Sequence, residues 1–181
     1  MSARKRPATI VVVMGVSGSG KTTIARSLAD RLGVTYSEAD EFHPPENIAK
    51  MESGVPLNDQ DRLPWLRSIA AWIHEQERAD VNGVVTCSAL KRSYRDLLRS
   101  GNDGVWFLHL AGSREVIGNR LAGRTGHFMP ASLLDSQFAD LQPLEPDEFG
   151  YTADVAEDAE TIVEKALTAI TAVSEAKADP T

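Results

Sequence analysis

The amino-acid sequence predicts an α/β fold with three layers, in which helices cover both faces of a five-stranded parallel sheet. Short apolar runs rich in β-branched residues alternate along the chain with longer segments whose apolar residues recur at helical spacing. Such alternation is typical of parallel strands joined by right-handed helical crossovers. The length of 181 residues suits a single domain, with a core over about residues 8–173 and a frayed tail over 174–181.

The first strand, loop and helix follow one another directly. Residues 9–14 are a short β-branched, apolar run that predicts a strand, and residues 23–32 carry apolar side chains at helical spacing up to Gly33. A weaker strand at 34–37 places the acidic segment 38–41 at its carboxyl end. Open α/β sheets bind their ligands at that edge, so we expect these carboxylates to face the loop after the first strand.

The rest of the chain continues the alternation. A short helix at 46–53 precedes a turn-rich segment that offers an Asn or Asp as N-cap, and a long amphipathic helix follows. We expect a strand at 83–87 and then a helix running to about Arg99. We expect the later strands at 105–110 and 151–155. Helices are expected at 113–124, 131–141 and 159–173, and a loop at 123–130.

The segment between the first strand and helix matches the motif G-x-x-x-x-G-K-[ST] at every fixed position. Its residues are Gly15, Val16, Ser17, Gly18, Ser19, Gly20, Lys21 and Thr22. The glycines permit a loop whose backbone N–H groups surround phosphate oxygens, and the following helix adds its positive N-terminal dipole. We expect these residues and Thr23 to bind a nucleotide, with Lys21 at the β- and γ-phosphates and the Thr22 hydroxyl on Mg²⁺.

The composition limits the partners and the compartment. A net charge of −7 argues against nucleic-acid binding through a basic surface, so we expect a small-molecule partner. The single cysteine, Cys87, fits a reducing cytosol. No apolar run approaches the length of a membrane span, and the apolar run that follows residues 1–7 is too short for a signal peptide. We therefore expect no membrane association and a cytoplasmic location.

Several classes of protein use such a loop, and the fold alone does not separate them. A GTPase would be expected to carry the guanine motif N-K-x-D, which is absent from the sequence. A transporter-type ATPase would need its signature segment and a longer chain. The small kinases remain as the favoured class.

Further blocks of the sequence are specific in combination. They are Asp40 with Phe42-His43-Pro44, Asn47-Ile48-Ala49-Lys50-Met51, Gly54 with Pro56-Leu57-Asn58-Asp59, Asp61-Arg62, Pro64-Trp65-Leu66, Cys87-Ser88-Ala89-Leu90-Lys91, Tyr94-Arg95-Asp96-Leu97-Leu98-Arg99, Gly126-His127-Phe128, Leu133-Leu134 and Gln137-Phe138. With the glycine loop, they resemble the gluconate kinases, relatives of shikimate kinase, over about residues 10–170. The resemblance implies a P-loop fold like that of the nucleoside-monophosphate kinases, with a lid over about residues 120–142, and a homodimer.

The resemblance also implies the reaction, in which ATP and Mg²⁺ serve to convert D-gluconate to 6-phospho-D-gluconate. Asp40, at a strand end facing the loop, is expected to accept the proton of the attacking hydroxyl. Glu38 stands where such kinases usually have an aspartate, and is expected to hold Mg²⁺ through water. Arg120 and Arg124 resemble the lid arginines, of which Arg120 would stack on adenine and Arg124 would reach the transferring phosphate.

A pocket for gluconate needs cations and hydrogen-bonding side chains, because the molecule carries one carboxylate and several hydroxyls. Lys91 and Arg95 lie one helical turn apart after the third strand and are candidates. The remaining candidates, taken from the resembling blocks, are Asp40, His43, Arg62, Tyr94, His127 and Gln137. His109 lies inside an apolar strand and is interpreted as structural.

Three other readings stay open from the sequence. A shikimate kinase would be expected to have a glycine triplet after the third strand, where this chain has Ser88-Ala89-Leu90. A nucleoside-monophosphate kinase is the other alternative within the class. A non-catalytic nucleotide-binding switch would need no acceptor pocket, and the presence of Asp40 and Lys91 argues against it.

Overall fold

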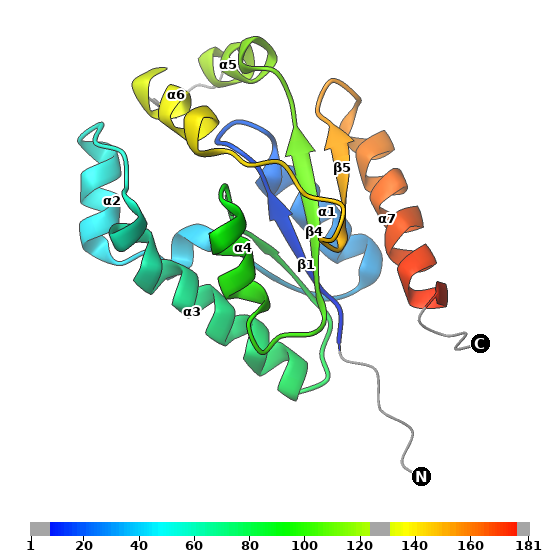
Figure 1. Cartoon of the computed structure of the whole chain (residues 1–181). Coiled ribbons are helices and arrows are strands. Elements are labelled where there is room, and N and C mark those ends of the chain that lie inside the picture. The colour runs from blue at the N-terminus through cyan, green and yellow to red at the C-terminus, as the bar shows by residue number, and fades with distance from the viewer. Residues whose placement is uncertain (1–7, 124–130, 177–181) are drawn as a thin grey trace.

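A five-stranded, wholly parallel sheet lies at the centre of the computed structural model, which describes residues 8–123 and 131–176 (Figure 1). The strands are β1 (Ile10–Met14), β2 (Thr35–Ser37), β3 (Gly83–Thr86), β4 (Val105–Ala111) and β5 (Gly150–Asp154). Their order across the sheet is β2-β3-β1-β4-β5, and each neighbouring pair is parallel. The structure confirms the predicted number and direction of the strands.

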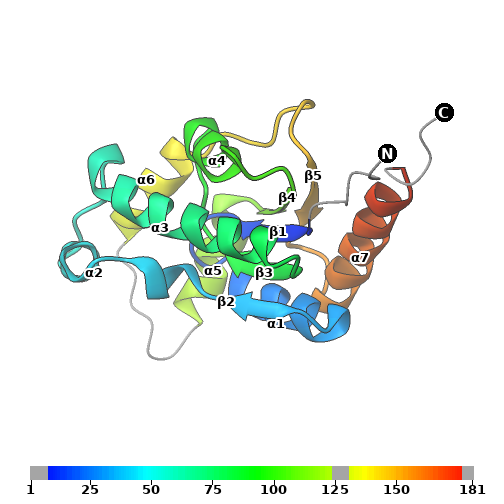
Figure 2. The same ribbon diagram turned by 90° about the horizontal axis from the view of Figure 1, so that it is seen from below.

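Helices cover both faces of this sheet. They are α1 (Lys21–Leu32), α2 (Pro45–Glu52), α3 (Asp59–Arg78), α4 (Arg92–Arg99), α5 (Arg114–Ala122), α6 (Ala131–Asp140) and α7 (Ala159–Ala176), with a short 3₁₀ helix, η1 (Ala39–Phe42). α1 and α7 lie on one face of the sheet, and α3 and α4 lie on the other (Figures 1 and 2). These positions confirm the three predicted layers.

The hydrophobic core is built around the central strands, which are covered by helices on both faces of the sheet. Every residue of β1 is buried, and so are residues 105–110 of β4, which occupy the centre of the sheet. A strand covered on both sides has no solvent face, so its sequence is a continuous apolar run rather than an alternating one. That pattern made β1 and β4 recognisable from the sequence.

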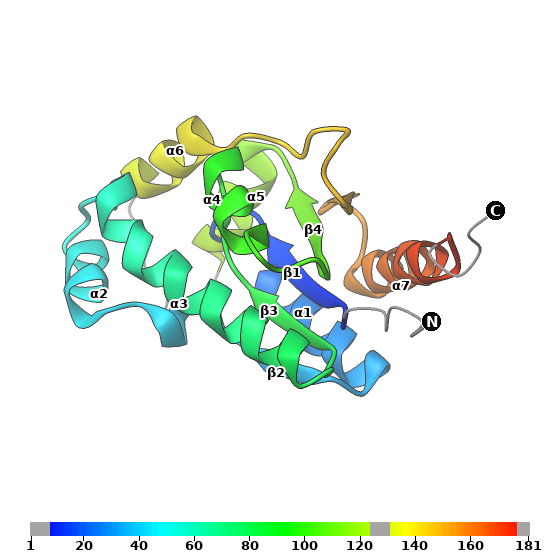
Figure 3. The same cartoon turned by 60° about the horizontal axis from the view of Figure 1, so that its bottom comes forward.

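The site end of the molecule is formed by elements beyond the carboxyl ends of the strands. α5 and α6 lie there, and α2 and the start of α3 close the same corner (Figure 3). Asn58 caps α3 by accepting the Asp61 N–H at 2.8 Å, and the Asp61 carboxylate accepts the Asn58 N–H at 2.9 Å. This capping box fixes the N-terminus of α3 at the edge of the site.

Apart from shifts of one or two residues at the ends of elements, the structure differs from the prediction in two places. η1 was not predicted, since its residues read as an acidic strand end. α7 continues to Ala176, so residues 174–176 belong to the helix rather than to a frayed tail, because no helix breaker occurs before Pro180. Residues 124–130 of the loop predicted over 123–130, and residues 177–181, lie outside the described residues. In the described ranges, no helix has both the length and the apolar character to cross a membrane.

Candidate active site

The phosphate loop joins β1 to α1 with a backbone conformation that depends on its glycines. Gly15, Gly18 and Gly20 have positive φ angles of 147°, 82° and 93°. A Cβ at residue 15 would lie 2.8 Å from the Leu110 carbonyl oxygen, so a larger residue does not fit there. The Lys21 ammonium donates to the Gly15 carbonyl oxygen at 3.0 Å. The loop therefore curves around its own lysine, as a phosphate cradle does.

A cavity of about 550 Å³ opens at this loop, and we call it the donor cavity. Among its lining residues are Ser17, Gly18, Gly20, Lys21, Thr22 and Thr23 from the loop and α1, with Glu38, Asp40 and Thr86 from the ends of β2 and β3. Val16 and Ser19, which were also predicted to bind nucleotide, have buried side chains. The loop and the acidic segment therefore face one another, as expected for the carboxyl edge of a parallel sheet.

Glu38 is held at the wall of the donor cavity by two hydroxyl groups. The Thr86 hydroxyl donates to Glu38 Oε2 at 2.8 Å and accepts the Ala39 N–H at 3.0 Å. The Tyr36 hydroxyl donates to the other carboxylate oxygen. The sequence analysis missed Thr86 and Tyr36 as site residues. The position of Thr86 at the carboxyl end of a predicted strand is the signal that could have found it.

The donor cavity offers oxygen ligands of the kind that Mg²⁺ prefers. The Thr22 hydroxyl and the Glu38 and Asp40 carboxylates all line it. Within residues 8–123 and 131–176, no three His, Cys, Asp or Glu side chains form a cluster that could hold a metal ion. The side chains present therefore fit an ion that arrives with further ligands, such as Mg²⁺ bound to nucleotide phosphates.

Asp40 belongs to η1, and His43 is the residue directly after that helix. Asp40 lines the donor cavity, and within the described residues no hydrogen bond occupies its carboxylate. The His43 ring stacks on Trp65, with ring centroids 4.3 Å apart and ring planes 7° apart. Burial lowers the pKa of His43 to about 4, an effect that the Asp40 carboxylate opposes and the Arg62 guanidinium reinforces. His43 is therefore neutral at pH 7.

A second cavity adjoins the first, and we call it the acceptor cavity. Arg62 lines it together with apolar residues of α3 and α6, among them Trp65 and Leu133. Five residues line both cavities, namely His43, Met51, Trp65, Ser88 and Gln137. A molecule in the acceptor cavity would therefore lie next to the end of a molecule in the donor cavity.

Arg62 is buried, and its guanidinium has partners on the protein side. It donates to the Tyr94 hydroxyl at 2.8 Å and to Asp140 Oδ2 at 3.0 Å. The Lys91 ammonium donates to Asp59 Oδ1 at 2.9 Å, and the Tyr94 hydroxyl donates to the same oxygen. Lys91 and Tyr94 thus form a polar cluster beside Arg62, and neither is among the described residues that line the two cavities.

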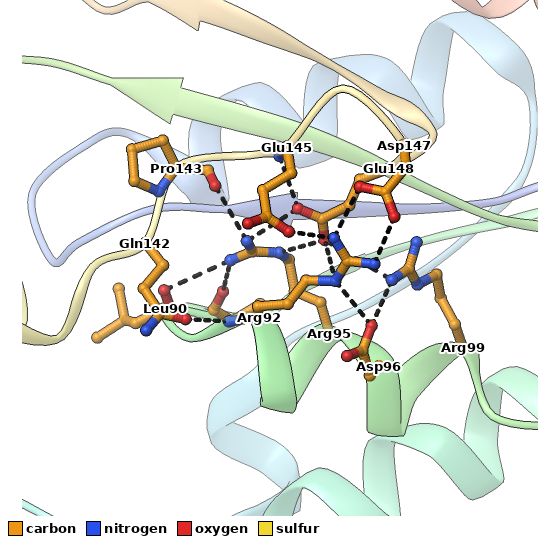
Figure 4. Close-up of polar contacts among 11 residues, drawn as sticks. Leu90, Arg92, Arg95, Asp96, Arg99, Gln142, Pro143, Glu145, Asp147 and Glu148 are labelled. Atoms are coloured by element: carbon orange, nitrogen blue, oxygen red, sulfur yellow. Dashed lines mark hydrogen bonds and ion pairs between the residues drawn. The ribbon is translucent and has the colours of Figure 1, made fainter.

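Arg95 lies away from both cavities, which corrects its predicted place in the substrate pocket. The side chain is fully buried, and its Nε and Nη2 donate to the two carboxylate oxygens of Glu148 at 2.7 and 3.0 Å (Figure 4). Its Nη1 donates to the Ala89 carbonyl oxygen at 2.9 Å, and Nη2 also donates to that of Pro143 at 3.2 Å. Arg95 therefore joins α4 to the segment before β5 and has no N–H group directed at a ligand.

The residues predicted to form the lid or contact it lie in different places. Arg120 is exposed at the C-terminal end of α5, where its guanidinium donates to the Val155 carbonyl oxygen just after β5. Arg124 and His127 lie outside the described residues. Gln137 of α6 contacts the phosphate loop, because its Oε1 accepts the Ser17 N–H at 2.7 Å and its Nε2 donates to Ser17 Oγ at 3.1 Å.

The structure thus brings most of the predicted site residues into two adjoining cavities. They are Ser17, Gly18, Gly20, Lys21, Thr22, Thr23, Glu38, Asp40, His43, Arg62 and Gln137. Lys91 lies beside them in the cluster around Tyr94, and Arg95 lies apart. The arrangement places a nucleotide site against a pocket that carries one buried cation and several hydrogen-bonding groups.

Comparisons with known proteins agree with this geometry. The sequence pattern of the shikimate kinase family matches residues 17–147. A gluconokinase of Gluconobacter oxydans is 52% identical over 138 residues, which are 76% of this chain and 78% of that protein.

Two solved structures are also similar over nearly the whole chain. One is described as a sugar kinase from Janibacter, with 57% identity, a TM-score of 0.88 and coverage of 91% of this chain and 95% of that one. The other is a gluconokinase from Sinorhizobium meliloti, with 45% identity, a TM-score of 0.83 and coverage of 95% and 96%.

Proposed function

This chain belongs to the gluconokinase family, and on that premise we propose that it transfers the γ-phosphoryl group of ATP to the 6-hydroxyl of D-gluconate, giving 6-phospho-D-gluconate. The observation that carries the proposal is the shared wall between the donor cavity, built on the phosphate loop, and the acceptor cavity, which contains Arg62 and His43. In-line phosphoryl transfer needs the attacking hydroxyl next to the γ-phosphate, on the side opposite the leaving oxygen, and most of the catalysis is positioning and charge stabilisation.

The donor cavity holds the nucleotide in this proposal. Backbone N–H groups of the loop surround the phosphates, and the Lys21 ammonium turns from the loop carbonyls to the β- and γ-phosphates. Thr22 would hold Mg²⁺ directly and Glu38 would hold it through water. When bound, Mg²⁺ neutralises part of the phosphate charge. Arg120, at the end of α5, would stack on the adenine.

Asp40 is the proposed acceptor of the hydroxyl proton. Its carboxylate lines the donor cavity three residues before His43, which lines both cavities. An ionised carboxylate within hydrogen-bond distance of the attacking hydroxyl orients it and takes its proton as the new O–P bond forms. Arg124, assigned by resemblance, would stabilise the charge on the transferring phosphoryl group.

In this proposal the sugar acid occupies the acceptor cavity and the adjoining part of the donor cavity, because the acceptor cavity alone has a volume of only about 50 Å³. Arg62 supplies the positive charge for its carboxylate, and His43 and Gln137 supply hydrogen bonds to its oxygens. Lys91 adds a second positive charge in the cluster beside Arg62. His127, assigned by resemblance, would contact the bound substrate from the lid.

The remaining features of the proposal concern the whole protein. We infer that it acts in the cytoplasm as a homodimer and that its partner is the small-molecule substrate rather than nucleic acid or a membrane. The net charge of −7 supports the choice of a small molecule over nucleic acid. Light scattering after size exclusion would test the dimer.

An acceptor panel tests the proposed function. Release of ADP from Mg·ATP would be followed with D-gluconate, shikimate, AMP or no acceptor. We expect turnover with gluconate and only background release in the other three reactions. Turnover with shikimate or AMP alone would contradict the proposed acceptor, and ATP binding without any acceptor-dependent release would contradict a kinase activity.

A further inference from the structure

The His43 ring is held rigidly where the two cavities meet. It stacks on Trp65 with nearly parallel rings, and Trp65 is only 3% exposed. The Trp65 indole N–H donates to the Ala39 carbonyl oxygen at 2.9 Å, so the tryptophan is itself fixed in rotation. The imidazole therefore has one face covered, and its two ring nitrogens must find partners at its edges.

The contact with Asn47 of α2 shows whether His43 Nδ1 donates or accepts a hydrogen bond. Asn47 is 5% exposed, and its Nδ2 lies 2.8 Å from the Asp61 carbonyl oxygen and 3.3 Å from His43 Nδ1. A carbonyl oxygen only accepts hydrogen bonds, so the atom beside it is the amide nitrogen. The second N–H of that nitrogen is then directed at His43 Nδ1. Nδ1 must accept, which places the proton of the neutral ring on Nε2.

The orientation of Asn47 is fixed in turn by the start of α3. Asp61 belongs to the capping box with Asn58, and its carboxylate also accepts from the Lys50 ammonium at 2.6 Å. These contacts hold the Asp61 backbone against α2 before any substrate binds. They also give a role to Asn47 and Lys50, two residues of the block from Asn47 to Met51.

We propose that Asn47 is a positioning residue that holds His43 as the Nε2–H tautomer, so that Nε2 offers a fixed hydrogen-bond donor to an oxygen of the acceptor sugar acid. The inference rests on the proposed function and deepens it. His43 lines both cavities, and within the described residues no side chain or backbone group takes a hydrogen bond from Nε2. The donor therefore faces the space where the acceptor lies.

A neutral donor suits the neighbouring carboxylate. The charged groups that influence His43 are Asp40 on η1 and Arg62 on α3. An imidazolium beside Asp40 would stabilise the ionised carboxylate and make it a weaker base. Because burial keeps the ring neutral, Nε2–H orients the substrate without drawing the Asp40 carboxylate into an ion pair.

Two substitutions of His43 test the donor. The amide nitrogen of a glutamine reaches the position of Nε2, whereas that of an asparagine reaches only the position of Nδ1. We expect His43→Asn to raise the KM for gluconate at least about tenfold more than His43→Gln, with the KM for Mg·ATP unchanged in both, since one hydrogen bond to an oxygen is worth about a factor of ten. Equal effects of the two substitutions on the gluconate KM would overturn the proposal.

The tautomer can be measured directly in the wild-type protein, and a variant of Asn47 then tests what sets it. Long-range ¹H–¹⁵N correlation spectra of the wild-type protein distinguish the protonated ring nitrogen from the unprotonated one, and His43 is assigned by the signal lost in His43→Gln. We expect the proton on Nε2 at pH 7, and its movement to Nδ1 in Asn47→Asp, whose carboxylate can only accept. A proton on Nδ1 in the wild type would overturn the inference even if gluconate is phosphorylated. Absence of gluconate turnover would instead overturn the proposed function, whatever the tautomer.

Discussion

Asp40 is the residue on which the proposed chemistry depends most. Its carboxylate faces the donor cavity close to a neutral histidine. Asp40→Asn keeps the size and polarity of the side chain but removes its ability to take a proton. We expect kcat with gluconate to fall by a factor of about 10² or more, while the Kd for ATP stays within a few-fold of wild type. Steady-state kinetics and calorimetric titration with ATP measure the two quantities.

A matched control lies on the same 3₁₀ helix. Glu41 is exposed and accepts from the Ser37 hydroxyl at 3.3 Å, and it is not among the residues that line the donor cavity. Glu41→Gln is therefore expected to retain wild-type kcat and KM. If Asp40→Asn turned over gluconate as fast as Glu41→Gln, Asp40 would not be the proton acceptor.

Some site residues can be identified from a short stretch of sequence, whereas others depend on contacts between distant segments. Lys21 and Thr22 could be chosen as candidates because a short motif specifies both the loop and the start of α1, and both residues line the donor cavity. The partners of Arg62 have no such signal. Its guanidinium donates a hydrogen bond to Asp140, which lies 78 residues further along the chain, on α6. Sequence patterns placed the side chain near the pocket but could not show that its guanidinium is also bonded to Tyr94 and Asp140.

Among the elements, α4 shows how a correct helix can carry a wrong assignment. Helical spacing placed Arg95 one turn after Lys91 and predicted the helix itself. It could not reveal which face packs inward, because the partner Glu148 lies 53 residues away. Burial acts to raise the pKa of Glu148, but hydrogen bonds from Arg95 and the Glu145 N–H outweigh it and lower that pKa below its usual value. Glu148 is therefore ionised at pH 7, and its contact with Arg95 is structural.

This assignment predicts a loss of stability rather than of substrate binding. Glu148→Gln leaves the Arg95 guanidinium buried without its counter-charge, which costs about 3–5 kcal/mol of unfolding free energy in comparable buried pairs. The KM for gluconate of the folded protein is expected to stay at its wild-type value. Urea denaturation and steady-state kinetics measure the two effects.

The exposed ion pair between Arg114 and Asp135 serves as the control. Its side chains are 51% and 56% exposed, so Asp135→Asn is expected to leave the free energy of unfolding nearly unchanged. If Glu148→Gln instead had a much higher KM for gluconate and an unchanged free energy of unfolding, Arg95 would belong to the substrate pocket. That result would contradict its structural role.

At the scale of the whole molecule, the sequence predicted the layers and strand number but not the order of the strands. Runs such as β1 and β4 are recognisable because burial on both faces removes polar residues from them. Which strand pairs with which depends on contacts between distant segments, such as β1 with both β3 and β4. Local composition carries little of that information.

The buried histidine of β4 predicts how stability depends on pH. His109 is 2% exposed, and neither ring nitrogen has a hydrogen-bond partner within the described residues. Burial and then the charge of Arg95 lower the pKa of His109 to about 4, whereas an unfolded histidine titrates near 6.5. Between these values the unfolded chain binds a proton that the folded protein does not, so stability falls as the pH decreases from about 6.5 to 4.

His109→Leu removes this contribution. Between pH 7 and 4 the variant is expected to lose about 3 kcal/mol less unfolding free energy than the wild type, the equivalent of the pKa shift. Urea denaturation at a series of pH values gives the comparison, and His74→Gln, at an exposed histidine of α3, is the control. If the free energy of unfolding depended on pH identically in His109→Leu and wild type, the pKa of His109 would not be lowered by folding.

The central claim is that a phosphoryl group passes from ATP in the donor cavity to a sugar acid in the adjoining one. The most direct test is to identify the product formed from Mg·ATP and D-gluconate, by mass spectrometry for its composition and by ³¹P–¹H correlation for the carbon that carries the phosphate. We expect one phosphogluconate for each ADP formed, with the phosphate on the 6-hydroxyl. Formation of ADP with inorganic phosphate, or a phosphate on another oxygen, would contradict the proposed placement of the acceptor against Asp40.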